Sequence, residues 1–451
     1  MEKRVDIIGG GLAGSEAALQ LAADGFAVRL IEMRPFRTTG AHHGDKCAEL
    51  VCSNSLKSTK EASAAGMLKA ELELLGSHLL AFAHESSVPA GGALAVDREQ
   101  FASLVTDALV QAGVARIEAE VVGIDPSGAF IIEDAHHEGP YVLEDPAPFC
   151  IIATGPLTSP ALAESLRALT GEDHLSFYDA AAPIVYADSL DYDVVFGQSR
   201  YEEGVGDYLN APFNKEEYEA FAQELIDARC VIKKEFESSD LFQACQPIEE
   251  IARKGFDAPR FGPLKPVGLV DPRTQKRPWA VVQLRAEGRD KQCYNLVGFQ
   301  TNLAFPEQER VFRMIPGLEH AEFVRYGVMH RNTFLNSPAL LGTDLSLKAC
   351  PNVFFAGQIT GFEGYMESAA CGLLAARSME ARLSGRAFTP PPADTMCGAL
   401  LRYITTPTKD FQPMGANMGL LPAPETRIRD KRQRYLAVAQ RAVAAMERYL
   451  G

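Results

Sequence analysis

Short apolar runs separated by glycine or polar residues mark the beginning of the chain. Val5–Ile8 is mostly apolar and contains two β-branched isoleucines, which predicts a strand. Ser15–Ala23 has the composition of a helix that Gly25 can end, and Ala27–Ile31 predicts a second strand. A strand, a glycine-rich turn, a helix and a second strand in this order are typical of a βαβ unit.

Glycines occupy the predicted turn at the spacing G-x-G-x-x-G. We expect Gly9 to allow the tight turn, Gly11 to let the backbone approach a pyrophosphate, and Gly14 to let the helix pack close to the strand. The first turn of the helix offers free N–H groups to phosphates. Glu32 follows the second strand, 21 positions after Gly11, where its carboxylate can accept hydrogen bonds from ribose hydroxyls. The sequence therefore predicts a dinucleotide site made by Gly9, Gly10, Gly11, Leu12, Ala13, Gly14 and Glu32.

Two later apolar runs indicate which dinucleotide to expect. Phe149–Gly155 ends in Ala-Thr-Gly, and Asn352–Gly361 runs into glycines. A helix of small residues is expected to follow, from Glu363 to about Arg377. Flavoproteins with two dinucleotide-binding motifs share this plan, whereas a simple NAD dehydrogenase does not need the late strand–glycine–helix unit. The sequence therefore favours FAD, with further contacts expected from Thr154, Gly155, Gly357, Glu363 and Gly364.

The remaining pattern predicts the domain organisation. Asp97–Ala112 predicts a helix, Arg116–Glu133 alternates like a small β-meander, and the chain from Ala393 onward has a helical pattern. From Ser176 to about Asn336, prolines and aromatic residues increase and strand-like apolar runs appear. We predict an α/β fold in which a two-dinucleotide-fold (Rossmann-type) FAD-binding domain holds an inserted α+β substrate domain. The FAD-binding domain is expected at 1–175 and 335–451, the latter with C-terminal helices, and the inserted domain at 176–334.

Composition and charge narrow the class of protein. The chain has 451 residues, and its hydrophobic content of 47% supports an ordinary globular core. No apolar run approaches the ~18–20 residues of a membrane helix, and no signal peptide is evident. We therefore expect a cytoplasmic protein whose nine cysteines are thiols. The formal net charge of −15 argues against indiscriminate nucleic-acid binding, although it allows a local basic patch.

Two cysteines lie in settings that suggest chemistry. Cys52 follows the second predicted strand, on the side where a flavin would extend, and Cys245 lies within the inserted region. A thiolate is an effective nucleophile where nearby cations favour it, and Lys57 is a candidate cation for Cys52. The residues alone leave open whether each cysteine is a nucleophile or a small buried side chain. No metal is expected, because no common zinc-site spacing is matched by His42, His43, Cys47 and Cys52.

Five segments carry a resemblance to a known family, namely Ala48–Leu56, Cys245–Glu250, Asn295–Leu303, Ala356–Gly361 and Phe411–Asn417. On these marks, which extend over nearly the whole chain, the sequence resembles the folate- and FAD-dependent tRNA (uracil-5-)-methyltransferases. These enzymes are relatives of the glucose-inhibited division protein A group. One minor departure is Gly415, where a bulkier or polar residue is expected.

The resemblance implies a reaction and roles for both cysteines. It implies that 5,10-methylenetetrahydrofolate supplies a one-carbon unit, which is reduced with the help of FAD, and that NAD(P)H regenerates reduced FAD. The product is 5-methyluridine in the T-loop of tRNA. Uracil C5 becomes nucleophilic once a thiolate adds to C6, and the resemblance assigns this attack to Cys245. It assigns to Cys52 either removal of the C5 proton or a flavin- or methylene-linked adduct.

Binding of the tRNA T-arm requires a basic surface despite the acidic total. Lys254–Lys291 contains nine Lys/Arg against four Asp/Glu, and Glu425–Arg434 contains five against two. Either stretch can follow phosphates, and either can equally be an ordinary solvated face. No membrane association and no obligate protein partner are expected.

Three alternatives remain open at this point. The first is the wobble-uridine activity of the glucose-inhibited division protein A group, which carries a long C-terminal helical extension that is not expected after Gly451. The second is a flavin-dependent oxidoreductase with no RNA substrate. Such disulfide reductases usually carry a close cysteine pair and a second G-x-G-x-x-G motif, which we do not find. The third is a non-catalytic FAD-binding protein, which a yellow protein without turnover would favour.

Overall fold

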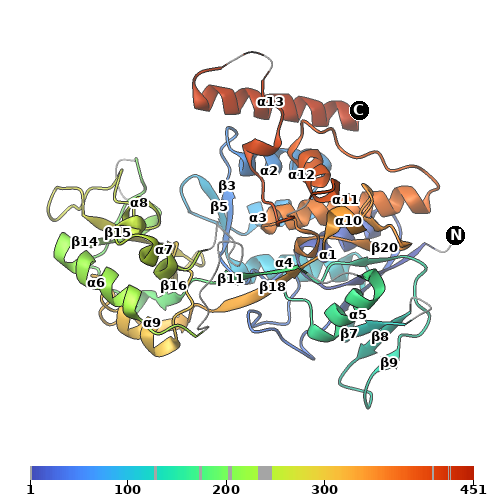
Figure 1. The fold of residues 1–451 in the computed structure, drawn as a ribbon, viewed down its shortest axis with the longest axis horizontal. Coiled ribbons are helices and arrows are strands. Elements are labelled where there is room, and N and C mark those ends of the chain that lie inside the picture. The colour runs from blue at the N-terminus through green and yellow to red at the C-terminus, as the bar shows by residue number, and fades with distance from the viewer. Residues whose placement is uncertain are drawn as a thin grey trace.

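The computed structural model describes residues 3–125, 129–171, 175–201, 206–231, 246–408, 411–424, 426 and 428–451. For residues 175–179, 330 and 331 it describes the backbone alone. The chain forms two large apolar cores, one around a mainly parallel sheet and one around an antiparallel sheet (Figure 1).

The parallel sheet carries the glycine-rich turn at its centre. Its strand order is β19–β20–β10–β1–β2–β6, and neighbouring strands are parallel except for β19 and β20. Ile7 of β1 pairs with Ile151 and Leu30, and all three are buried, as in a sheet covered on both faces. The strands are β1 Arg4–Ile8, β2 Ala27–Glu32, β6 Ala115–Glu118, β10 Cys150–Ile152, β19 Ser346–Leu347 and β20 Cys350–Phe355.

Helix α1 (Leu12–Ala23) connects β1 to β2 and packs along α11 (Tyr365–Leu383). The two helices approach closely, because a Cβ on Gly372 would lie 2.1 Å from the carbonyl oxygen of Ala13. Helix α1 starts earlier than predicted, directly after the glycine turn. Helix α11 extends beyond Arg377 to Leu383, and the residues of this extension are largely buried. Both predicted elements are therefore confirmed, with longer bounds.

The predicted meander is partly wrong. Its first strand, β6, joins the parallel sheet beside β2. The strands after it form a separate antiparallel sheet, against which α5 (Pro160–Thr170) packs. Alternating apolar positions do not distinguish an edge strand of a larger sheet from a meander strand. The helix predicted before this region is confirmed as α4 (Arg98–Gln111). The strands of the separate sheet are β7 Glu120–Ile124, β8 Phe130–Glu133 and β9 Tyr141–Val142.

The second large sheet has the order β13–β14–β15–β16–β12–β17 and is antiparallel. Its core is rich in phenylalanine, and rings such as Phe299 and Phe312 meet edge to face at 5.4 Å. The strands are β12 Ile184–Tyr186, β13 Phe196–Gly197, β14 Tyr208–Phe213, β15 Ala280–Ala286, β16 Cys293–Leu296 and β17 Phe323–Arg325. The helices are α6 Lys215–Asp227, α7 Ile248–Lys254, α8 Ala258–Phe261 and α9 Phe305–Phe312.

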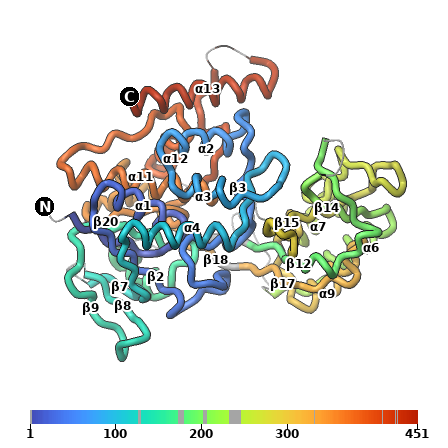
Figure 2. Tube along the Cα trace, turned by 180° about the vertical axis from the view of Figure 1, so that it is seen from behind, coloured from blue at the N-terminus to red at the C-terminus, as the bar shows by residue number. Residues whose placement is uncertain are grey.

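The chain passes between the two cores along one pair of strands, β11 (Leu175–Ala180) and β18 (Met329–Phe334). The two strands are antiparallel and lie between the cores in both views (Figures 1 and 2). The predicted domain boundaries near 175 and 334 fall at the outer ends of this pair. The division into domains itself remains a prediction.

The other elements surround the parallel-sheet core. The tail is not continuously helical from Ala393. Helix α12 (Met396–Thr405) and helix α13 (Lys431–Leu450) are separated by a stretch whose described residues contain one short 3₁₀ turn. Helix α13 packs against α2 (Figure 2). No helix in the described ranges is both long and apolar enough to cross a membrane. The remaining strands are β3 Ser55–Ser58, β4 Ser87–Val88 and β5 Ala93–Val96. The remaining helices are α2 Ala64–Leu75, α3 His78–Glu85, α10 Ser337–Leu340, α12 Met396–Thr405 and α13 Lys431–Leu450, with 3₁₀ turns at Ala187–Ser189, Gln358–Thr360 and Met418–Leu420.

Candidate functional site

A cleft opens at the carboxyl ends of the central parallel strands. It contains about 980 Å³ of empty space and is lined by the ends of β1, β2 and β10 and by the turn after β20. Strand β1 lies between β2 and β10. In an open α/β sheet, ligands usually bind in the space beyond the carboxyl ends of such central strands. The residues predicted to bind a dinucleotide that line this cleft are Gly9, Gly11, Leu12, Ala13, Glu32, Thr154, Gly155 and Gly357.

The glycine turn has the geometry that a closely bound phosphate requires. Gly9 has a φ of +98°, and a Cβ there would lie 2.7 Å from the oxygen of Ala153. A Cβ on Gly14 would lie 2.0 Å from the oxygen of Gly9, so α1 can pack close to β1. By contrast, a Cβ on Gly11 would meet no described atom within 4 Å, and Gly11 lines the cleft. The first N–H groups of α1, which has no side-chain cap, can therefore meet a phosphate in this space.

Glu32 ends β2 and is hydrogen-bonded within the protein. Its Oε2 accepts from the backbone N–H of Gly10 at 2.6 Å, and its Oε1 accepts from Arg34 Nε at 2.8 Å. Burial acts to raise the pKa of this carboxyl, but the charge and hydrogen bonds of Arg34, with the Gly10 N–H, lower it overall. Glu32 is therefore ionised near neutral pH and holds the glycine turn. Its position in the cleft lining also lets it accept from a ribose hydroxyl.

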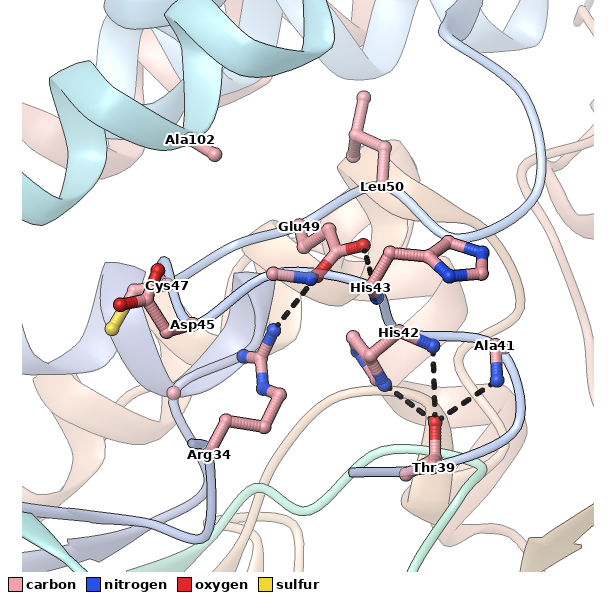
Figure 3. Close-up of polar contacts among 12 residues, drawn as sticks. Arg34, Thr39, Ala41, His42, His43, Asp45, Cys47, Glu49, Leu50 and Ala102 are labelled. Atoms are coloured by element: carbon pink, nitrogen blue, oxygen red, sulfur yellow. Dashed lines mark hydrogen bonds and ion pairs between the residues drawn. The ribbon is translucent and has the colours of Figure 1, made fainter. Parts of the chain in front are cut away.

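Arg34 is buried and connects β2 to the loop 39–49 (Figure 3). Its Nη1 lies 3.1 Å from Glu49 Oε2, and Glu49 Oε1 accepts from the backbone N–H of His43 at 2.9 Å. Burial, followed by the charge of Arg34, lowers the pKa of His42 to about 4, so this cleft-lining imidazole is neutral near pH 7. No spacing in the sequence predicts this network, because the conformation of the loop brings its members together.

The same loop does not form a zinc site in the part of the chain that the structure describes. No group of three His, Cys, Asp or Glu side chains there could hold a metal ion. Cys47 is buried, and burial raises the pKa of its thiol to about 11. No disulfide joins the cysteines in the described ranges to one another.

The late strand–glycine–helix unit reaches the cleft from the side opposite β2. A Cβ on Gly357 would lie 2.6 Å from the Cβ of Ala13, so this unit packs directly against α1. Tyr365 and Ser368, in the first turn of α11, line the cleft together with the start of α1. Two helix N-termini therefore face the same space, which favours an anionic ligand. The described cleft lining does not include four predicted contacts, Gly10, Gly14, Glu363 and Gly364.

Cys52 lies beside this cleft in the loop between β2 and β3. The hydroxyl oxygen of Tyr365 accepts from the backbone N–H of Cys52 at 2.7 Å and from that of Ser53 at 3.2 Å. Burial raises the pKa of the Tyr365 hydroxyl, so it stays neutral. The Cys52 Sγ lies 3.9 Å from the carbonyl oxygen of Ala180. The loop thus joins the cleft, through Tyr365, to β11 between the two cores.

Two arginines that were not predicted bind the backbone around Cys52. Arg98 Nη2 donates to the carbonyl oxygen of Cys52 at 3.0 Å, and Arg325 donates to that of Val51. Lys57 instead pairs with Glu367, with Nζ 2.7 Å from Oε1. Tyr365, Arg98 and Arg325 come from three distant segments, and no spacing in the sequence connects them to Cys52.

Cys245, the other predicted catalytic residue, lies outside the described residues. The segment that follows it begins α7, where Glu249 is fully buried. Glu249 accepts from Asn302 N at 2.6 Å and from Thr301 Oγ1 at 2.9 Å. Burial raises the pKa of Glu249 to about 7. Two segments that carried the family resemblance, 245–250 and 295–303, are therefore joined by these hydrogen bonds.

Comparison with known proteins places this geometry in a family. The family model described as Glucose inhibited division protein A matches residues 4–387. A protein of Listeria monocytogenes serotype 4b is 50% identical over 449 residues, which are 99% of each chain. A protein of Moorella thermoacetica is 52% identical over 446 residues, covering 98% of this chain and 97% of the relative. Both relatives are named methylenetetrahydrofolate–tRNA-(uracil-5-)-methyltransferase TrmFO.

Solved structures show the same fold at low sequence identity. GidA of Aquifex aeolicus in its form II crystal superposes with a TM-score of 0.68 at 16% identity. The match covers 99% of this chain and 73% of that one. This similarity agrees with the predicted Rossmann-type fold.

Proposed function

Since the chain belongs to the glucose inhibited division protein A family, we propose that it transfers a one-carbon unit from 5,10-methylenetetrahydrofolate to C5 of a uridine in tRNA. The observation that carries this proposal is the sequence identity to the two methyltransferases described above, which is 50% and 52% over nearly the whole chain. The cleft adds a physical reason, because Tyr365 both lines the cleft and accepts a hydrogen bond from the backbone N–H of Cys52, and Val51, the neighbour of Cys52, lines the same cleft.

FAD fits the cleft as its resident cofactor. The open side of Gly11 and the uncapped start of α1 can receive the pyrophosphate, and Glu32 can accept from the ribose. Thr154, Gly155 and Gly357 line the remainder of the cleft, toward the late unit that would seat the flavin end. When bound, FAD would supply the reducing equivalents for the transferred carbon, with NAD(P)H as their source.

We assign the two cysteines different roles, which the experiments below test. Cys245 is proposed to add as a thiolate to C6 of the target uracil, since this addition makes C5 nucleophilic. Cys52 is proposed to take the C5 proton or to carry an adduct. Its support is its position beside the cleft, with its backbone held by Tyr365 and Arg98.

We propose the T-loop of tRNA as the target and the stretch 254–291 as the RNA-binding surface. The exposed positions in this stretch include Lys265, Lys276 and Arg277, whose positive charges can meet phosphates. Arg285 contributes differently, because it is buried and donates to Asn54 Oδ1 at 2.7 Å. The stretch therefore splits into exposed cations available to RNA and a buried cation that joins the two cores. A cytoplasmic location and independence of a protein partner remain predictions.

The test is a complete reaction. The protein is incubated with unmodified tRNA, methylenetetrahydrofolate and NAD(P)H, and the tRNA is digested to nucleosides. The expected product is 5-methyluridine, formed only when folate and reductant are both present. Modification at the wobble position instead would support the alternative activity of the family. Oxidation of NAD(P)H with unchanged tRNA would support an oxidoreductase with no RNA substrate.

A further inference from the structure

Two arginines, one from each large core region, bind the loop of Cys52. Arg98, the first residue of α4, donates from Nη1 to the carbonyl oxygen of Leu50 at 2.6 Å and from Nη2 to that of Cys52 at 3.0 Å. Arg325, the last residue of β17, donates to the carbonyl oxygen of Val51. Helix α4 belongs to the parallel-sheet core and β17 to the antiparallel sheet. The loop is therefore fixed by both halves of the molecule.

The charges of these arginines are not balanced within the described residues. Glu287 pairs with Arg98, with Oε2 2.5 Å from Nε and Oε1 3.3 Å from Nη2. Arg325 forms no salt bridge in the described ranges, and its buried Nε has no hydrogen-bond partner there. Burial, followed by the charge of Arg98, lowers the pKa of Arg325. Glu287 forms its ion pair with Arg98 and interacts electrostatically with Arg325 and with Arg285 as well, so this cluster of described charges retains an excess positive charge.

We propose that Arg325, together with Arg98, is a positioning residue that stabilises the anionic form of the Cys52 sulfur. With both arginines protonated, the Cys52 thiol releases its proton to solvent, and the negative charge of the resulting thiolate balances the excess positive charge of the cluster. The proposal deepens the proposed function, since a thiolate at Cys52 is the form that can take a proton or carry an adduct. Arg98, Arg325 and Tyr365 all interact electrostatically with Cys52.

Three other described groups around the loop do not supply this positive charge. Tyr365 is neutral and its oxygen accepts from the Cys52 N–H. The Ala180 carbonyl presents an oxygen toward Sγ, and Glu287 is negative. None of these three groups carries a positive charge, so among the described residues that interact with Cys52 the two arginines are the ones that favour an anionic sulfur.

The experiment measures the reactivity of Cys52 itself. The FAD-loaded full chain is treated with iodoacetamide across a range of pH, and alkylation of the Cys52 peptide is followed by mass spectrometry. Replacing Arg325 by Met removes its charge, so the midpoint of alkylation should rise by about one pH unit or more. At a pH below the midpoints of both the unchanged protein and Arg325→Met, Cys52 should be alkylated about tenfold more slowly in the variant. Arg325→Lys keeps the charge and should return the midpoint close to that of the unchanged protein.

Two further variants make the test independent of folding defects. Arg313→Met removes an arginine that also donates to a backbone carbonyl, that of Ala321 at 3.0 Å, and should leave the midpoint unchanged. Glu287→Gln removes the shared negative charge while keeping the shape, so it should lower the midpoint. This second variant tests the proposal even if Arg325→Met does not fold.

Specific outcomes would overturn the proposal. An unchanged midpoint in folded, yellow Arg325→Met would do so, as would equal shifts in Arg325→Met and Arg325→Lys. A raised midpoint in Glu287→Gln would also contradict it. Because alkylation requires neither tRNA nor folate, these results are separate from the nucleoside assay. Failure of that assay contradicts the proposed function, whereas failure here contradicts only the role of Arg325.

Discussion

Replacing Gly11 by valine should remove FAD without unfolding the protein. Gly11 is the N-cap of α1 with φ −73° and ψ −168°, an extended conformation that valine also adopts. A Cβ there would meet no described atom within 4 Å. The expected cost is the loss of a favourable N-cap residue, under about 1 kcal/mol of unfolding free energy.

The effect on the cofactor should be much larger. The branched side chain would occupy the space through which the N–H groups of α1 reach a pyrophosphate. A loss of about a hundredfold in FAD affinity, or about 2.8 kcal/mol, is expected. The measurements are FAD titration by flavin fluorescence and urea unfolding of the cofactor-free forms, since bound FAD would itself stabilise the folded state.

Gly14→Ala is the matched control, because its Cβ would lie 2.0 Å from the oxygen of Gly9. Relief of this overlap requires α1 to move away from β1, so we expect both weaker FAD binding and a loss of about 1–3 kcal/mol in unfolding free energy. The two glycines should therefore fail differently. A folded Gly11→Val variant with a full flavin spectrum would refute the assignment of the pyrophosphate to this turn.

Three further predictions concern RNA binding, the cysteines and stability. Charge reversal at Lys265 and Lys276 should weaken tRNA binding and reduce its salt slope by about one unit per lost phosphate contact, with FAD retained. Unchanged affinity in filter binding would move the footprint to another surface, such as 425–434. Cys245→Ala should form no covalent complex with tRNA carrying 5-fluorouridine at the target, whereas Cys52→Ala should still form one and stall before product. A denaturing gel showing the reverse would exchange the two roles. Burial raises the pKa of Glu71 from its ordinary 4.5 to about 7, so its contribution to stability is lost as the pH rises through this range. Relative to Glu71→Gln, the unfolding free energy of the unchanged protein should therefore fall between about pH 5 and pH 7; parallel curves would contradict the shift.

The parts of the fold that could be predicted depend on local signals. The glycine spacing predicts a strand, a turn and a helix within a few residues, and Gly9 and Gly14 show the tight turn and the close helix packing expected of them, whereas the pyrophosphate contact of Gly11 stays a prediction. The strand Ala115–Glu118 was misplaced because its partner, β2, is distant in sequence, and its own alternation fits either sheet. The tail was misread because apolar spacing alone does not show where a helix stops.

The candidate site could be predicted only in part, for the same physical reason. The cleft lining follows from residues close to strand ends, which meet at one edge of a parallel sheet. The surroundings of Cys52 depend on Arg98, Arg325 and Tyr365, which the tertiary fold brings together. Lys57 was favoured by its proximity in sequence, yet the buried carboxylate of Glu367 holds its ammonium group. The charged groups near a loop residue are determined by tertiary packing, and proximity in the sequence does not predict them.

The most direct measurement follows the transferred carbon. Methylenetetrahydrofolate labelled with deuterium in its methylene group is incubated with the FAD-loaded protein, NAD(P)H and unmodified tRNA. Nucleoside mass spectrometry is then applied to the isolated T-loop fragment. We expect 5-methyluridine that carries the deuterium, and no labelled product with Gly11→Val. Unlabelled 5-methyluridine, or label in another nucleoside, would contradict it.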